Sequence, residues 1–147
     1  MEELWQIEAN IDDMNPQDME YVFHRLFALG VNDVWTIPIM MKKCRMAMML
    51  CVLCRQPLIE TVLDSIFKET STIGVRYFPV QRVACERSMR TVCIDNVSIH
   101  VKISLYHGEI VNISAEYDDC RKAAAHTGKS VEEWRRRARE EAYKQYG

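Results

Sequence analysis

Four short segments of the chain hold the carboxylates, cations and hydroxyls that could act on a ligand. The first is Asn10-Ile11-Asp12-Asp13-Met14, which lies between a predicted strand and a predicted helix. Two adjacent carboxylates offer hard oxygen ligands of the kind that Mg²⁺ and Mn²⁺ prefer. The alternative is that Asp12 and Asp13 are ordinary loop residues that cap the helix.

The second segment places three cations, Lys42, Lys43 and Arg45, in one turn between two apolar stretches. Lysine ammonium groups and the forked arginine guanidinium bind phosphate oxygens. A solvated turn with surface lysines would show the same pattern, so both interpretations remain open.

The third segment, Glu69-Thr70-Ser71-Thr72-Ile73-Gly74-Val75-Arg76, combines three hydroxyls with a glycine and an arginine at a predicted helix-to-strand junction. Hydroxyls and free backbone amides there could line an anion or a ribose. A hydroxyl-rich end of a helix is the alternative. This segment is not a Walker loop, because it contains no Gly-Lys-Ser or Gly-Lys-Thr.

The fourth segment, Glu116-Tyr117-Asp118-Asp119-Cys120, packs three acids, a phenol and a thiol into the start of a predicted helix. Acids at a helix N-terminus complement the helix dipole, which is the ordinary explanation. The alternative hypothesis is that one of these acids acts as a metal ligand or as a general base.

The cysteines and histidines do not indicate a metal site. Cys51-Val52-Leu53-Cys54 has the spacing of a zinc or thioredoxin motif but lies on a predicted strand, where residues three apart point to opposite faces. Because no secretory signal is visible, the six cysteines are interpreted as reduced thiols, mostly buried. The four histidines fall in four different predicted elements: His24, His100, His107 and His126.

Hydrophobic periodicity predicts the elements that position these segments. Residues 4–11, 33–40, 46–54 and 75–87 have strand patterns, and two helices start near Asn15-Pro16 and Gln56-Pro57. The apolar third strand is expected to be central and covered on both faces. The order strand, helix, strand, strand, helix, strand predicts an α+β fold with a ferredoxin-like split βαβ unit (βαββαβ), whose two helices cover one sheet face and leave the other for a partner or ligand.

The rest of the chain predicts a second subdomain. Residues 91–113 alternate as an antiparallel β-meander with two-residue turns at Asp95-Asn96 and His107-Gly108. Two C-terminal helices follow, and Ser130 begins the second of them. We predict a ferredoxin-like subdomain at 1–87 and a β-meander plus two-helix subdomain at 88–147.

Composition excludes several classes of protein. The 147 residues are 48% hydrophobic and 27% charged, which is typical of a globular domain. No apolar stretch approaches the roughly 20 residues of a spanning helix, and no secretory signal is visible, so we expect a cytoplasmic protein without a membrane partner. The net charge of −2 excludes a strongly basic nucleic-acid binder.

Charge is nevertheless separated along the chain. The first 24 residues hold seven acids and no Lys or Arg, whereas residues 42–90 hold nine cations and four acids. Two balancing solvated surfaces would explain this distribution. Such balance is the usual case, and the alternative is one site that holds a divalent cation on carboxylates and polyanionic phosphates on Lys and Arg.

Taken in order, the four segments resemble the C-terminal domain of the nickel insertion proteins called LarC. The likeness runs from about Glu8 to about Val131. Departures are Cys44, where relatives usually have Gly or Asn, Met46, where Pro is common, and Ala115, which replaces a Pro. Cys44 is therefore a poor candidate for an essential thiol.

The resemblance implies a CTP-dependent cyclometallase. Such proteins insert Ni²⁺ into pyridinium-3,5-bisthiocarboxylic acid mononucleotide to make the nickel-pincer nucleotide cofactor of lactate racemase. They require CTP with Mn²⁺ or Mg²⁺ and release CMP and pyrophosphate. The C-terminal domain is implicated in CTP binding. The chain is accordingly expected to be the C-terminal half of a homo-oligomeric enzyme, incomplete without an N-terminal nickel-binding domain.

The resemblance also suggests roles for the residues of the four segments. Expected metal ligands are Asp12, Asp13 and Asp119, and expected catalytic residues are Asp12, Asp13, Glu116 and Asp118. Expected nucleotide-binding residues are Asn10, Lys42, Lys43, Arg45, Thr70, Ser71, Thr72, Gly74, Arg76 and Tyr117. A competing hypothesis is a nucleotide-binding regulatory or oligomerisation module without catalysis. RNA binding is disfavoured, because the predicted central strand has no aromatic residue.

Overall fold

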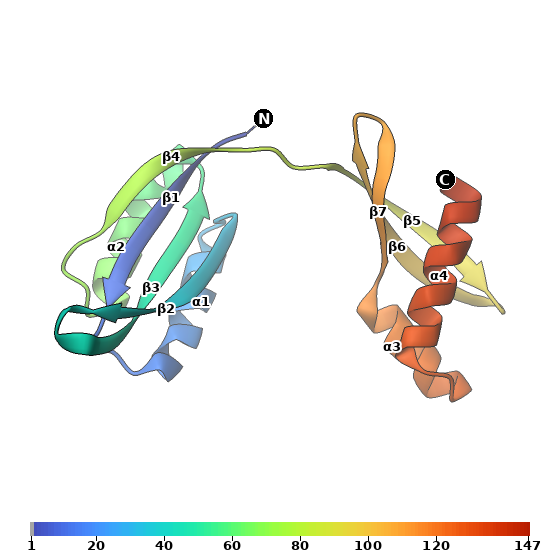
Figure 1. Ribbon diagram of the computed structural model, residues 1–147, viewed down its shortest axis with the longest axis horizontal. Coiled ribbons are helices and arrows are strands. Elements are labelled where there is room, and N and C mark those ends of the chain that lie inside the picture. The colour runs from blue at the N-terminus through green and yellow to red at the C-terminus, as the bar shows by residue number, and fades with distance from the viewer. Residues whose placement is uncertain (1) are drawn as a thin grey trace. The chain divides into compact units, whose positions relative to one another are not determined.

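The computed structural model describes residues 2–147, which divide into two compact units (Figure 1). The first unit ends at Val83 and the second spans Ala84–Gly147. Among the described residues, no helix combines the length and the apolar composition needed to cross a bilayer.

The first unit is a four-stranded antiparallel sheet in the order β2-β3-β1-β4. Its strands are β1 (Glu2–Ile11), β2 (Asp33–Met41), β3 (Arg45–Cys54) and β4 (Arg76–Arg82). Strand β1 pairs antiparallel with both β3 and β4. With helix α1 (Met19–Ala28) before β2 and helix α2 (Ile59–Glu69) before β4, this is the predicted ferredoxin-like split βαβ arrangement.

Both helices pack on the same face of this sheet (Figure 1). Val22 and Leu26 of α1 and Val62 and Ile66 of α2 are almost fully buried. They meet the alternate β1 and β3 residues that point to that face: Ile7, Ala9, Ile11, Leu50, Val52 and Cys54. Burial of these apolar side chains provides the main stabilisation of the first unit.

Among the described residues of the first unit, no helix packs on the opposite face of the sheet. Strand β3 is interior because it pairs with a strand on each edge, but the prediction that both of its faces are covered is wrong. Its residues Met49 and Leu53 remain partly exposed, while Cys51 is buried opposite Glu8 and Trp35 of the neighbouring strands. An apolar strand indicates burial, but it does not reveal which layers supply that burial.

The second unit is a three-stranded antiparallel meander followed by two helices. Its elements are β5 (Glu86–Ile94), β6 (Val97–Tyr106), β7 (Glu109–Ala115), α3 (Tyr117–Thr127) and α4 (Val131–Tyr146). The extended stretch predicted at 75–87 is thus two strands, because β4 ends at Arg82 and β5 begins at Glu86.

The turns and caps of the second unit follow the predicted residues. Asp95, Asn96, His107 and Gly108 all have positive φ, as the two residues of a type I′ hairpin turn require. The Ser130 hydroxyl accepts a 3.0 Å hydrogen bond from the backbone N–H of Glu133, which caps α4.

The core of the second unit forms where α3 and α4 cover the meander. Trp134 and Ala138 of α4 are at most 1% exposed and pack with Ile99 and Val101 of β6. The indole N–H of Trp134 donates to Thr127 Oγ1 at 3.0 Å, so the one polar atom of this side chain has a partner.

Candidate functional site

Three of the four predicted segments meet at one edge of the first unit. Because β3 and β4 run antiparallel to β1, both begin where β1 ends. The end of β1, the turn before β3 and the loop before β4 therefore lie together. They surround a hollow of about 310 Å³ lined by Asn10, Ile11, Asp12, Met41, Ser71, Thr72, Ile73, Gly74 and Arg76.

Arg76 is held in the wall of this hollow by three neighbours. Its Nε donates to Glu8 Oε1 at 2.8 Å, and its Nη2 lies 3.2 Å from Asn10 Oδ1 and 2.9 Å from Met49 Sδ. Glu8 in turn accepts from Gln6 Nε2 at 2.9 Å. The guanidinium is thus fixed before a ligand arrives, which lowers the entropic cost of using its remaining N–H groups.

Arg45 lies at the same end of the sheet, beside Asp12. Its Nη2 is 3.3 Å from Asp12 Oδ2, and both side chains remain partly exposed. The preceding turn is a single 3-10 turn, Lys42–Cys44, in which Lys43 has a φ of 62° and Cys44 a φ of 58°. Within residues 2–147 neither Lys42 nor Lys43 forms an ion pair, so both ammonium groups are available to an anion.

The hydroxyl segment forms the opposite wall. Thr70 Oγ1 donates to the Ile66 carbonyl at 2.7 Å and ends α2. Thr72 Oγ1 donates to the Gly74 carbonyl at 2.9 Å and lies 3.4 Å from the Asn10 carbonyl. These bonds tie the loop to the end of β1, while Ser71 stays exposed and can face a ligand.

The fourth segment lies in the second unit, at the start of α3. Glu116 is the N-cap residue, its backbone N–H donates to the His100 carbonyl at 2.9 Å, and its side chain makes no capping bond. Glu116, Tyr117 and Asp118 are exposed. Their participation in one site with Asp12 and Asp13 stays a prediction.

Asp119 is already engaged within the second unit. Its Oδ2 accepts from the backbone N–H of His100 at 2.8 Å and lies 2.7 Å from Nδ1 of the same residue. These hydrogen bonds, with the backbone one foremost, lower the pKa of the Asp119 carboxyl. A metal ion would have to compete with both contacts, which favours a structural role for Asp119 in joining α3 to β6.

We predict that Asp119→Asn destabilises the second unit by about 1 kcal/mol, the difference between a charge-assisted and a neutral hydrogen bond. Because the folded-state pKa lies below the ordinary value of 3.8, the stabilisation is present above that pH and is lost as the pH falls through the folded-state pKa. Urea unfolding of both proteins across acidic pH measures this. A difference in stability that stays constant down to the lowest pH would contradict the assignment. The control is Asp118→Asn, because the Asp118 carboxylate makes no hydrogen bond among residues 2–147.

Metal ligands are sparse in the described part of the chain. Among residues 2–147, no three His, Cys, Asp or Glu side chains converge as a metal site would require. Mg²⁺ in nucleotide enzymes commonly uses one or two carboxylates and completes its shell with phosphates and water. Asp12 and Asp13, exposed beside cations and hydroxyls, fit that donor set.

The cysteine prediction is only partly correct. Cys51, Cys54 and Cys120 are buried, but Cys44, Cys85 and Cys93 are exposed. Burial raises the pKa of the Cys51 and Cys54 thiols, and their opposite orientation on β3 confirms that they do not form a zinc or thioredoxin pair.

Comparison with known proteins identifies the family. The model of the family described as nickel insertion protein matches residues 1–135. The chain belongs to the nickel insertion protein family. It is 42% identical over 127 residues to the pyridinium-3,5-bisthiocarboxylic acid mononucleotide nickel insertion protein of Thermotoga sp. (strain RQ2), covering 86% of this chain and 32% of that protein. The corresponding protein of Clostridium kluyveri is 41% identical over 132 residues, with 90% and 33% covered.

Two solved structures share the fold of the chain. The fold is similar to LarC2, described as the C-terminal domain of a cyclometallase involved in the synthesis of the NPN cofactor of lactate racemase, in its apo form. The TM-score is 0.84 at 32% identity, with 92% of this chain and 93% of that chain covered. A protein from Methanopyrus kandleri AV19 shares the fold with a TM-score of 0.66 at 24% identity. The match to LarC2 confirms the resemblance and the α+β fold inferred from the sequence.

The chain spans about a third of the length of the curated nickel insertion proteins that it matches. This chain therefore corresponds to one part of those longer proteins.

Two residues that position Arg76 beside the hollow were not predicted from the sequence. Glu8 and Met49 both contact Arg76. The alternation of β1 places Glu8 on the same face as Asn10, which was a usable signal. Its pairing with Arg76 depends on the β1–β4 register, which aligns Glu8 with Arg76 and which the sequence does not reveal.

Proposed function

We propose that the chain is the CTP-binding domain of a CTP-dependent nickel insertase. The whole enzyme would insert Ni²⁺, as substrate metal, into pyridinium-3,5-bisthiocarboxylic acid mononucleotide to make the nickel-pincer nucleotide cofactor of lactate racemase. The observation that carries the proposal is the convergence of three sequence-distant segments around one hollow with a fixed guanidinium, hydroxyls and a carboxylate.

The cations would hold the triphosphate. Arg76 offers pre-oriented N–H groups from the wall, and Arg45 can exchange its exposed contact with Asp12 for a phosphate oxygen. Lys42 and Lys43 would reach phosphates from the turn as flexible point charges. Asn10, Thr70, Ser71, Thr72 and Gly74 would contact phosphate or ribose from the other wall.

Asp12 and Asp13 would hold the Mn²⁺ or Mg²⁺ that accompanies CTP. Such an ion offsets negative charge on the phosphates and on the leaving pyrophosphate. Glu116 and Asp118 are proposed as further catalytic acids, Asp119 as a metal ligand only if it releases His100, and Tyr117 as a nucleotide contact. Glu116 and Asp118 are exposed in the second unit, so their carboxylates are available to a ligand.

The proposed enzyme needs more than this chain. The relatives are about three times as long, which supports an N-terminal nickel-binding region as partner. Assembly into a homo-oligomer is part of the same proposal. The open face of the first sheet, with exposed Ile37 and Phe78, offers apolar surface for such contacts.

The proposed phosphate clamp, formed by Lys42, Lys43, Arg45 and Arg76, can be tested by removing two of its exposed cations. We expect the double variant Lys42→Ala/Arg45→Ala to bind Mg²⁺-CTP roughly tenfold more weakly by isothermal titration calorimetry, because each lost charge was a solvated contact. The double variant Lys102→Ala/Arg55→Ala removes the same two kinds of charge outside the four segments and should bind normally. Equal affinity of all three proteins would show that the clamp is elsewhere.

The alternative is a nucleotide-binding regulatory or oligomerisation module without chemistry of its own. Incubation with CTP and Mn²⁺, alone and with the N-terminal region of a relative, distinguishes the two. Release of CMP and pyrophosphate in the combined reaction supports the insertase. Tight CTP binding without release in either reaction supports the module.

A further inference from the structure

The hollow of the first unit offers cations and hydroxyls but no surface on which a base can stack. Its volume of about 310 Å³ lies at the lower end of the roughly 300–1,000 Å³ of small-molecule pockets. None of its described lining residues is aromatic. A nucleoside triphosphate whose phosphates fill this hollow must therefore place its base on a neighbouring surface.

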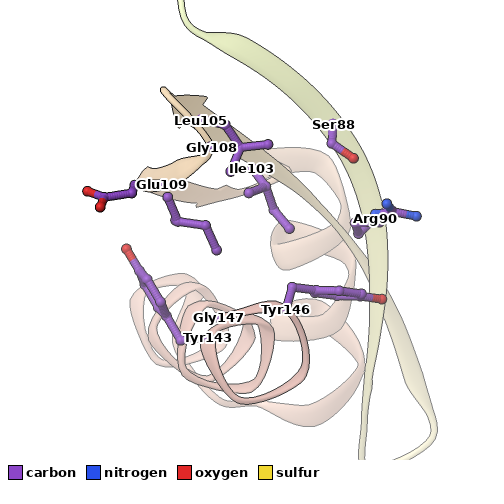
Figure 2. Close-up of a pocket in the computed structure, with 10 residues that line it drawn as sticks. Ser88, Arg90, Ile103, Leu105, Gly108, Glu109, Tyr143, Tyr146 and Gly147 are labelled. Carbon is purple, nitrogen blue, oxygen red and sulfur yellow. The ribbon is translucent and has the colours of Figure 1, made fainter.

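A hollow of about 540 Å³ in the second unit has tyrosines but lacks the charge for a triphosphate. It lies between the β6–β7 hairpin, strand β5 and the last turns of α4 (Figure 2). Figure 2 shows Glu109 beside Tyr143, where the carboxylate repels phosphates. Arg90 is the one cation among its described lining residues, and its guanidinium carbon already lies 5.7 Å from the centroid of the Tyr146 ring. This hollow therefore does not suit a polyphosphate chain.

Strand β4 continues from the first hollow onto the open face of its sheet. Arg76 and Phe78 are two residues apart on β4, so they point to the same face. The register sets Phe78 directly opposite Gln6 of β1 on that face. Two residues of a strand span roughly 6.6 Å, similar to the reach of a ribose between a phosphate and its base. Phosphates at Arg76 therefore bring the base over Phe78, whose ring is 39% exposed.

The side-chain amide of Gln6 has a fixed orientation beside this ring. Its Nε2 donates to Glu8 Oε2 at 2.9 Å, and Glu8 Oε1 accepts from Arg76 Nε at 2.8 Å. A carboxylate accepts hydrogen bonds but does not donate them, so a flipped amide would set two acceptors against each other. Among residues 2–147 no donor bonds to Gln6 Oε1, and this oxygen is not buried. The open face thus presents one oriented, accessible acceptor next to Phe78.

We propose that Phe78 and Gln6 bind the base of the nucleotide and select cytosine over uracil, an inference that rests on the proposed CTP site. The pyrimidine ring stacks on Phe78. Gln6 Oε1 accepts a hydrogen bond from the exocyclic amino group of cytosine. Uracil carries a carbonyl oxygen at the same ring position, so two acceptors meet and the bond is lost. Ile37 lies on the opposite edge strand, β2, where contacts between copies leave the β4 side of the face free for the base.

Isothermal titration calorimetry of the whole chain with Mg²⁺-CTP and Mg²⁺-UTP tests this selection. The wild type is expected to bind CTP roughly tenfold more tightly than UTP. Gln6→Leu should lower the CTP affinity to that of UTP and leave the UTP affinity nearly unchanged. Phe78→Ala should weaken both nucleotides roughly tenfold, because stacking does not depend on the exocyclic group. Gln81→Leu and Tyr77→Ala, exposed on the other face of β4, are the matched controls.

Several outcomes would overturn the assignment. Equal affinity of the wild type for CTP and UTP, or a CTP preference that survives in Gln6→Leu, would remove Gln6 from the base site. An equal loss of both nucleotides in Gln6→Leu would do the same, because Gln6 would then only support Glu8 and Arg76. A lower sedimentation mass of Phe78→Ala with unchanged nucleotide affinity would assign Phe78 to a contact between copies.

Failure of this inference is distinguishable from failure of the proposed function. Absence of CTP and UTP binding by the wild type would refute the CTP-binding proposal and this inference with it. CTP binding that depends on Arg76 but not on Gln6 or Phe78 would refute the base site alone. Gln6 and Phe78 are both partly exposed, so the variants are expected to fold, and an unchanged thermal melt verifies this.

Discussion

Arg76→Gln is expected to weaken Mg²⁺-CTP binding by roughly 100-fold, more than any other single change in the hollow. The reason is preorganisation. Glu8, Asn10 and Met49 fix the guanidinium before binding, so its remaining N–H groups meet a phosphate at little entropic cost. Glutamine retains a polar side chain but lacks the positive charge and the forked set of N–H donors of the guanidinium.

The matched control for this variant is Arg82→Gln, at the other end of β4 and outside the hollow. Calorimetric titration with Mg²⁺-CTP should give the wild-type affinity for Arg82→Gln and a much lower one for Arg76→Gln. An unchanged affinity of Arg76→Gln, with an unchanged thermal melt, would remove the hollow from the nucleotide site.

Trp134→Ala is expected to destabilise the second unit by about 3–5 kcal/mol, as large aromatic truncations in a core do. Trp134 is 1% exposed, its indole N–H bonds to Thr127, and the Arg137 guanidinium lies 5.1 Å from its ring centroid. The truncation therefore leaves a cavity and removes the indole donor to Thr127, whose hydroxyl keeps its bond to the Ala123 carbonyl. Trp134→Phe retains an aromatic ring and should cost less.

Differential scanning calorimetry of the same variant tests the division into units. We propose that the domain boundary lies between Val83 and Ala84 rather than after residue 87, because a cut at 87 would divide β5. Trp134→Ala should then lower only the transition of the second unit, and Ile66→Ala only that of the first. If both variants shift one common transition, the units do not unfold independently.

The fold was predictable because local patterns agreed with the tertiary structure. Alternation in β1 and β6, the Asn15 and Ser130 caps and the two-residue turns each indicated the element that formed. The coverage of β3 was not predictable, because an apolar run does not distinguish a face under helices from one filled by neighbouring side chains.

The site was predictable as a set of segments but not as contacts. Antiparallel pairing of β1 with β3 and β4 accounts for the meeting of three segments. The contacts of Arg76 with Glu8 and of Arg45 with Asp12 depend on register and side-chain conformation. The His100–Asp119 pair likewise joins elements that are distant in sequence, so the fourth segment gave no sign that Asp119 has a structural partner.

The two ion pairs around the hollow have a consequence for ligand selection. Arg45 and Arg76 are each paired with a carboxylate, so the long-range attraction of a bare polyanion falls to Lys42 and Lys43 of the neighbouring turn. A free triphosphate must displace Asp12 from Arg45 and is then repelled by the released carboxylate. A nucleotide that arrives with its own divalent cation meets no such barrier, because the ion takes the carboxylate while the phosphate takes the guanidinium. We therefore expect the protein to distinguish the metal complex of a nucleotide from the free nucleotide, and to ignore nucleic acids although their phosphates are chemically similar.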